Sequence, residues 1–264
     1  RRQRQMCIRD RIRPLPDALE STEADLAETV RLVEEAGGKI LARQGDIRDL
    51  ACQQQLVTDG IETFGRIDHV IANAGILTWG LTWELTEEQF ADVVDVNLVG
   101  TWKTLKAVIP PMIDARNGGS ITIISSTAGL KAMPVQSSYS ASKFGLRGLA
   151  QSVAKELGPK RIRVNTVHPY AVNTPMGVED PKAFEAFEEY GEHFPSMMNH
   201  YPVATLDDLS DASVHRNFDP YLDIDWDSPQ MAVVPNDRRW IMSPHDPVAV
   251  SYTHLRAHET VLDL

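Results

Sequence analysis

A tyrosine, a lysine and a serine form a candidate acid–base group in this sequence. Tyr139 and Lys143 stand four residues apart in a stretch with helical character, so both project from one face of the helix. A tyrosine hydroxyl with a pKa of about 10 is a poor base at neutral pH, but a lysine ammonium one turn away stabilises the phenolate. Ser126 would hold the oxygen of an alcohol or carbonyl substrate while Tyr139 takes or returns its proton. Such a reaction also needs a hydride acceptor.

The elements that must position these side chains follow from the apolar pattern. Short apolar runs predict buried parallel strands at 39–43, 69–72, 120–124 and 162–167. They alternate with helical patterns at 22–36, 50–64, 86–112 and 138–157. The alternation predicts an α/β fold of one domain, with a doubly wound parallel sheet and right-handed crossovers.

Ligands of such a sheet bind at the carboxyl ends of its strands, so the residues after each run are candidates for the site. These residues are Asp46, Asn73-Ala74-Gly75, Ser125-Ser126 and His168-Pro169. Beyond Pro169 the pattern weakens into a helix with Phe184, Phe187 and Phe194 near one face, followed by proline-broken acidic sequence without clear strands. We interpret residues 171–245 as a substrate lid and variable region.

Composition excludes several classes of protein. The chain has 264 residues, and its 42% of hydrophobic residues is typical of a globular domain. Its formal net charge is −11. No apolar run approaches the roughly 20 residues of a membrane span. The acidic balance argues against nucleic acid or an anionic membrane as a partner. Two cysteines cannot form a disulfide framework, so we expect a cytoplasmic location.

Five ordered motifs together resemble the classical short-chain dehydrogenase/reductase family, which has a Rossmann fold. They are Asn73-Ala74-Gly75, Asn97 within Val96-Asn97-Leu98, Ser126 thirteen residues before Tyr139, Tyr139-Ser-Ala-Ser-Lys143, and Arg163-Val164-Asn165 leading to Pro169. The resemblance covers about residues 39–176 and depends on the agreement of all the spacings. It implies an oxidoreductase that transfers a hydride between NAD(P) and a secondary alcohol or ketone.

The resemblance also implies a role for individual residues. Ser126 would orient the substrate, Tyr139 would be the acid/base, Lys143 would lower the tyrosine pKa and bind the nicotinamide ribose, and Asn97 would hold the water of a proton relay. Asp46 and Ile47 would contact the adenine, and Val172 and Thr174 the carboxamide. The full set of expected cofactor-binding residues is Asp46, Ile47, Asn73, Ala74, Gly75, Tyr139, Lys143, Pro169, Val172 and Thr174. A homotetramer packed through the helices at 86–112 and 138–157 is implied as well.

Two parts of the family pattern differ here. The sequence contains no T-G-x-x-x-G-x-G, the glycine-rich turn that holds the pyrophosphate at a helix N-terminus. The acidic residue that selects NAD over NADP is missing too, so NADP is not excluded. Residues 21–37 and 126–131 resemble the mycofactocin-associated, carveol-dehydrogenase-like branch, which implies NAD and oxidation of a hydrophobic secondary alcohol.

Both ends of the chain resemble a translated sequencing adapter. Met6–Asp10 can be encoded so that its reverse complement reads Val-Ser-Tyr-Thr-His, which is the sequence of 250–254. We therefore treat 1–10 and 250–264 as foreign, and 11–249 as a partial Rossmann domain that is incomplete at both ends.

Other chemistries have weaker support. His193, His200 and His215 lack the spacing of a metal site, and Ser228 replaces the glycine that a calcium loop around Asp223 would need. No G-x-S-x-G elbow of a serine hydrolase occurs. We therefore expect no metal. The alternative hypothesis is a non-catalytic Rossmann scaffold, or an inactive fragment without a pyrophosphate loop.

Overall fold

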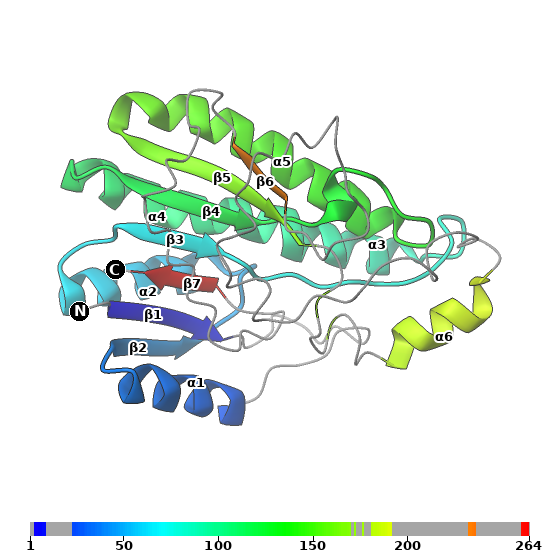
Figure 1. The fold of residues 1–264 in the computed structure, drawn as a ribbon, viewed down its shortest axis with the longest axis horizontal. Coiled ribbons are helices and arrows are strands. Elements are labelled where there is room, and N and C mark those ends of the chain that lie inside the picture. The colour runs from blue at the N-terminus through cyan, green and yellow to red at the C-terminus, as the bar shows by residue number, and fades with distance from the viewer. Residues whose placement is uncertain are drawn as a thin grey trace.

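A seven-stranded sheet organises the described residues of this computed structural model, with strand order β2-β1-β7-β3-β4-β5-β6 (Figure 1). The structure describes residues 3–8, 23–169, 172, 176, 181–191, 232–235 and 260–263. The strands are β1 Gln3–Ile8, β2 Lys39–Gln44, β3 His69–Ala72, β4 Gly119–Ile124, β5 Ile162–His168, β6 Ala232–Pro235 and β7 Thr260–Asp263. β1 to β5 are parallel to one another, whereas β6 and β7 run antiparallel to their neighbours.

The four strands predicted from apolar runs are confirmed as β2, β3, β4 and β5. β6 lies in a region where no strand was expected, and β1 and β7 belong to the end segments that we set apart from the fold. β1 pairs with β2, and β7 lies between β1 and β3. The foreign origin of the two end segments stays a prediction, because the unpaired edge of a strand can pair with a segment of any origin.

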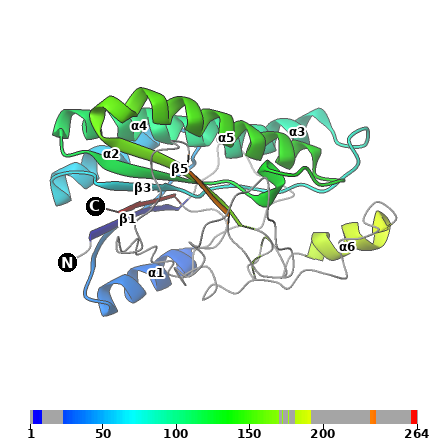
Figure 2. The same ribbon diagram turned by 45° about the horizontal axis from the view of Figure 1, so that its top comes forward.

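Helices cover both faces of the sheet, as the predicted doubly wound fold requires. They are α1 Glu23–Glu35, α2 Leu50–Phe64, α3 Glu87–Val94, α4 Thr101–Ala115, α5 Ser137–Leu157 and α6 Pro181–Glu189. Figure 2 shows α2, α4 and α5 on one face and α1 on the other. The main core lies between the first of these faces and the sheet, where Ile121, Ile123 and Leu146 are fully buried.

The helix expected over 86–112 is interrupted. Thr86 caps α3 through a reciprocal capping box with Gln89. Between α3 and α4, residues Asp95–Gly100 form one π-helical segment, η1, which inserts an extra residue into the helical path. Asn97 lies in this segment, at the carboxyl side of the sheet where the site was expected.

No helix in the described part of the chain is both long enough and apolar enough to cross a bilayer.

Candidate active site

Asn97 is held at the centre of the site by three hydrogen bonds. Its Oδ1 accepts from the Ile76 N–H at 2.7 Å, and its Nδ2 donates to the Ile76 carbonyl at 2.9 Å and to Ser142 Oγ at 3.0 Å. No part of Asn97 is exposed. The side chain therefore fastens the loop after β3 to α5. The relay water that the family resemblance places at Asn97 stays a prediction.

Lys143 extends its ammonium into the space beside Gly75. A Cβ built on Gly75 would lie 3.3 Å from Asn97 Oδ1 and 3.4 Å from Lys143 Nζ, so the glycine leaves room for these two groups. Lys143 Nζ donates to the Ile124 carbonyl at 3.0 Å. Burial lowers the pKa of Lys143 to about 8. The ammonium is thus still the main form at neutral pH.

Tyr139 is half-buried, and its hydroxyl is hydrogen-bonded to Ser126. Burial raises the pKa of Tyr139 to about 12, although the bond from Ser126 acts in the opposite direction. The Lys143 ammonium lies 5.4 Å from the centre of the tyrosine ring. In this arrangement desolvation of the phenolate outweighs the hydrogen bond that stabilises it, and the lowering of the tyrosine pKa by Lys143 stays a prediction.

Ser126 stands on a tight turn between β4 and α5. It caps the short 3-10 helix η2, Thr127–Gly129, and its Oγ accepts from the Ala128 N–H at 3.1 Å. The preceding Ser125 donates to the Lys143 carbonyl at 3.0 Å. A Cβ on Gly129 would come within 2.7 Å of that same carbonyl, so only glycine permits the turn to approach α5 this closely.

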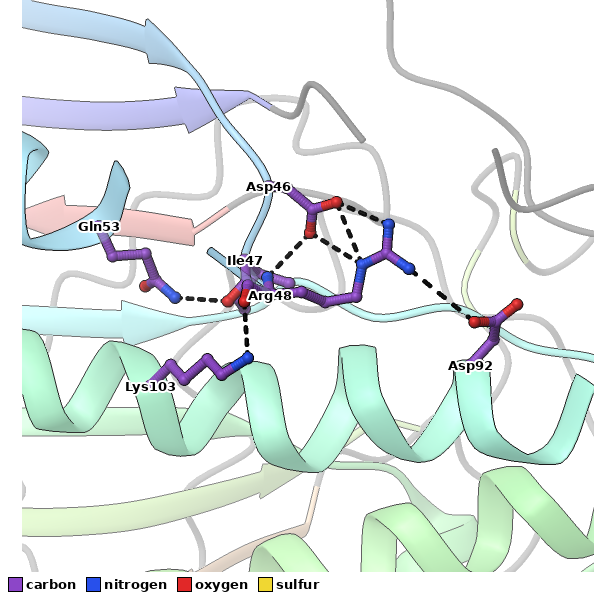
Figure 3. A network of polar contacts seen from close by, with 6 residues as sticks. All are labelled: Asp46, Ile47, Arg48, Gln53, Asp92 and Lys103. Carbon is purple, nitrogen blue, oxygen red and sulfur yellow. Dashed lines mark hydrogen bonds and ion pairs between the residues drawn. The ribbon is translucent and has the colours of Figure 1, made fainter. Parts of the chain in front are cut away.

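A buried ionic network fixes the residues that follow β2 (Figure 3). The Asp46 carboxylate accepts from the Arg48 side chain, with the shortest distance 2.7 Å to Nη2, and Arg48 Nη1 lies 3.8 Å from Asp92 Oδ1 on α3. Gln53 donates to the Ile47 carbonyl and Lys103 to the Arg48 carbonyl, each at 2.6 Å. The pKa of Arg48 is raised: desolvation opposes the charge, but the Asp46 hydrogen bond and nearby carboxylates outweigh it.

An apolar cluster joins this network to the acid–base group. Its buried members are Ile47, Ala74, Ile76, Val93 and Val96, and Tyr139 packs against them. The structure therefore brings Asp46, Ile47, Ala74, Gly75, Asn97, Ser126, Tyr139 and Lys143 to one edge of the sheet.

The remaining predicted residues divide into placed and unplaced ones. Asn73 directly follows β3, and Pro169 is tied to the Ser126 turn, since its carbonyl accepts from the Thr127 N–H at 2.9 Å. Val172 is half-buried, whereas Thr174 and Phe194 lie outside the described residues. The network residues Arg48, Gln53 and Asp92 were not predicted; the charged pair two residues apart, Asp46 and Arg48, was the only local signal.

In the part of the chain that the structure describes, no group of three or more His, Cys, Asp or Glu side chains could hold a metal ion.

The fold and this arrangement of serine, tyrosine and lysine are those of the family that the sequence motifs resemble, and comparison with known proteins agrees. The family model of short chain dehydrogenase matches residues 18–183, more than half of the chain. The chain belongs to this family.

Several relatives share long stretches of the sequence. An uncharacterised NAD-dependent oxidoreductase of Mycobacterium tuberculosis is 52% identical over 198 residues, which are 74% of this chain and 72% of that protein. The (−)-trans-carveol dehydrogenase of Rhodococcus erythropolis is 35% identical over 236 residues, covering 88% of this chain and 81% of that protein.

Solved structures show the same likeness. A short chain dehydrogenase from Mycobacterium paratuberculosis bound to NAD superposes with a TM-score of 0.69 at 39% identity, covering 76% of this chain and 77% of that one. A carveol dehydrogenase from Mycobacterium avium in complex with NAD gives a TM-score of 0.65 at 36% identity, covering 79% and 72%. The predicted family and fold class are thus confirmed.

A second family model, P-aminobenzoate N-oxygenase AurF, matches residues 200–254. This stretch overlaps the segment that we interpreted as lid and variable region, and apart from Ala232–Pro235 it lies outside the described residues.

Proposed function

We propose that this chain is an NAD-dependent oxidoreductase that transfers a hydride between NAD and a hydrophobic secondary alcohol or the matching ketone. The observation that carries the proposal is the convergence of Ser126, Tyr139 and Lys143 beside Asn97 and Gly75. The NAD-bound relatives and the carveol dehydrogenases support both the cofactor and the substrate class. NADP and a link to mycofactocin stay open predictions.

The residues present fit the nicotinamide end of the cofactor. Because Gly75 has no side chain, its backbone lies close to the Lys143 ammonium, which has three N–H donors. Among the described residues, the one acceptor of a hydrogen bond from the Lys143 ammonium is the Ile124 carbonyl. Lys143 would therefore bind the ribose hydroxyls, and Asp46 and Ile47 the adenine. When bound, NAD supplies the hydride acceptor.

The protein's own residues manage the proton. Ser126 Oγ uses one acceptor position for the Ala128 N–H and shares a hydrogen bond with Tyr139, which leaves it one further position for a substrate oxygen. Because the pKa of Tyr139 is raised to about 12, its hydroxyl is protonated at neutral pH and ready to donate to a carbonyl oxygen. Alcohol oxidation requires the phenolate form of the same oxygen, which would form by loss of the tyrosine proton to solvent, be stabilised by the Lys143 charge, and then receive the alcohol proton.

We further propose that the chain self-associates through α4 and α5, in line with the predicted homotetramer. Trp102 and Phe144 are 44% and 40% exposed on these helices, and large aromatic side chains are commonly buried in subunit interfaces. For the lid, the hydrogen bond from Tyr190 to Glu84 at 3.0 Å supports a position of α6 on the side of the molecule toward which the carboxyl ends of the strands point (Figure 1). The division into 11–249 and two foreign ends, and the cytoplasmic location, stay predictions.

NADH binding measured by nicotinamide fluorescence tests the proposal. The chain as given is compared with a version carrying a family-like first strand and glycine-rich turn. The expected result is that the chain as given binds NADH and reduces NAD with carveol. Binding by the restored version alone would show that the chain as given lacks affinity because it has no pyrophosphate site. Binding by neither version would contradict the proposal and favour the non-catalytic scaffold.

A further inference from the structure

A buried imidazole connects the end of β5 to the turn that carries Ser126. His168 is the last residue of β5, and none of its surface is exposed. Its Nδ1 lies 2.8 Å from the Ser126 carbonyl oxygen, and its Nε2 lies 3.0 Å from the Thr166 hydroxyl. The ring therefore spans the gap between the strand and the backbone of Ser126.

The chemistry of the two partners determines where the imidazole proton lies. A carbonyl oxygen only accepts hydrogen bonds, so Nδ1 must be the protonated nitrogen. Burial lowers the pKa of His168 to about 4, and the charges of Arg147 and Lys143 on α5 act in the same direction. The ring is thus neutral at pH 7, and Nε2 accepts from the Thr166 hydroxyl.

Backbone bonds hold the residues on either side of Ser126, and the Ser126 carbonyl accepts both from the Gly129 N–H at 2.8 Å and from the imidazole. The Ser125 N–H donates to the Val167 carbonyl at 2.8 Å, and the Thr127 N–H donates to the Pro169 carbonyl at 2.9 Å. His168 adds the bond to Ser126 itself. Three consecutive residues of the turn are therefore attached to the end of β5.

We propose that His168 is a positioning residue that holds the Ser126 hydroxyl against Tyr139. The Ser126 carbonyl selects the imidazole tautomer which this requires, and the Thr166 hydroxyl donates to the other ring nitrogen. The catalytic meaning of this inference rests on the proposed function. The geometric part does not rest on it, because it concerns the contact between the Ser126 and Tyr139 hydroxyls in the free protein. A misplacement of about 1 Å at a reacting group can cost on the order of 100-fold in rate, so such a tie affects turnover.

Two amide variants separate the hydrogen bond from the volume of the ring. In His168→Asn the side-chain amide donor lies near the place of Nδ1, whereas in His168→Gln it lies farther out, near the place of Nε2. The readout is the ¹³Cζ resonance of Tyr139 in tyrosine-labelled protein, assigned by its loss in Tyr139→Phe. We expect the resonance to move in His168→Gln and to stay near the wild-type position in His168→Asn.

A second pair of variants addresses the tautomer. Thr166→Val removes the hydroxyl at similar volume, and Thr166→Ser retains it. Imidazole ¹⁵N shifts, assigned by comparison with His168→Asn, should show a protonated Nδ1 and a bare Nε2 in the wild type and in Thr166→Ser. In Thr166→Val, Nδ1 should stay protonated, and the Nε2 resonance should move because this nitrogen loses its hydrogen-bond donor. A protonated Nε2 in the wild type, or a Tyr139 resonance indifferent to His168→Gln, would overturn the proposal.

Kinetics then connect the contact to the reaction. With a secondary alcohol and NAD, His168→Gln should lower kcat/KM for the alcohol by about tenfold or more and leave KM for NAD unchanged, and His168→Asn should recover most of it. Equal kcat/KM in wild type and His168→Gln would contradict the positioning role. A moved Tyr139 resonance in a protein that oxidises no alcohol would instead contradict the proposed function and leave the geometry intact.

Discussion

The Lys143 ammonium lies 5.4 Å from the centre of the Tyr139 ring and donates its described hydrogen bond to the Ile124 carbonyl. The lysine is therefore adjacent to the tyrosine through the ring face, and the tyrosine hydroxyl is paired with Ser126 instead. The Lys143 ammonium is hydrogen-bonded to the Ile124 carbonyl and the Tyr139 hydroxyl to Ser126, so substitutions of the two side chains can be tested separately.

Replacing Tyr139 by phenylalanine removes the proton donor while retaining the ring that packs on the Ala74 cluster. We expect kcat for a secondary alcohol to fall by at least about 100-fold, because positioned acid–base groups contribute about 10² to 10⁴. The urea midpoint should change little. Tyr190→Phe, which removes a hydroxyl far along the chain on the lid side, is the matched control. Full turnover by Tyr139→Phe would show that this mechanism is wrong.

The lowered pKa of Lys143 makes stability depend on pH. The folded protein releases the lysine proton at about pH 8, whereas the unfolded chain retains it up to the model value of 10.5. The unfolded state then binds more protons between these values, so stability from this group rises with pH above about 8. Urea unfolding from about pH 7 to about pH 10 should show this rise relative to Lys143→Met. Parallel curves for the two proteins would mean that the buried ammonium is not desolvated as the structure indicates.

Removing the Asn97 side chain leaves the Ile76 N–H and carbonyl without partners in a buried place. We expect Asn97→Ala to lower the free energy of unfolding by about 2 to 4 kcal/mol, since each orphaned buried group costs about 1 to 3 kcal/mol. Gln55→Ala is the control, because that amide pairs with Asp59 on an exposed surface. Similar losses in both variants, measured by urea unfolding, would refute the assignment.

The Asp46–Arg48 pair should show strong coupling in a double-mutant cycle. Arg48→Met alone leaves two carboxylates, Asp46 and Asp92, buried near each other without the cation, and we expect a loss of about 3 to 5 kcal/mol. Adding Asp46→Asn should restore part of the stability, which thermal and urea unfolding will detect. Additive effects of the two changes would contradict a direct pair. Arg66→Met, at the more exposed Asp68 pair, should have little effect.

A charge on α4 tests the proposed self-association. Trp102→Glu should reduce the mass measured by light scattering after gel filtration, because an unpaired carboxylate is costly in an apolar contact. Trp83 is 76% exposed outside α4 and α5, so Trp83→Glu should leave the mass unchanged. A monomeric wild type, or an assembly insensitive to Trp102→Glu, would contradict the interface.

Sequence alone predicted the elements whose pattern is local. Strands β2, β3, β4 and β5, helices α1, α2 and α5, and the spacing of Ser126, Tyr139 and Lys143 all follow from periodicity or motif. β6 was missed because strand pairing at the sheet edge joins segments that are distant in the chain. The burial of Arg48 was missed too, since its partner Asp92 comes from α3 and no local pattern indicates it. The direction of the Tyr139 pKa depends on desolvation, which only packing determines.

The π-helical segment Asp95–Gly100 adds one residue between α3 and α4 and so changes the direction in which the side chains of α4 point. One extra residue rotates every later side chain by about 100° relative to an uninterrupted α-helix. The direction of Asn97 toward Ile76 and that of Trp102 toward the exterior are therefore set by the same count of residues. A length change of one residue there would misalign the catalytic edge and the outer surface together, so the two cannot vary independently.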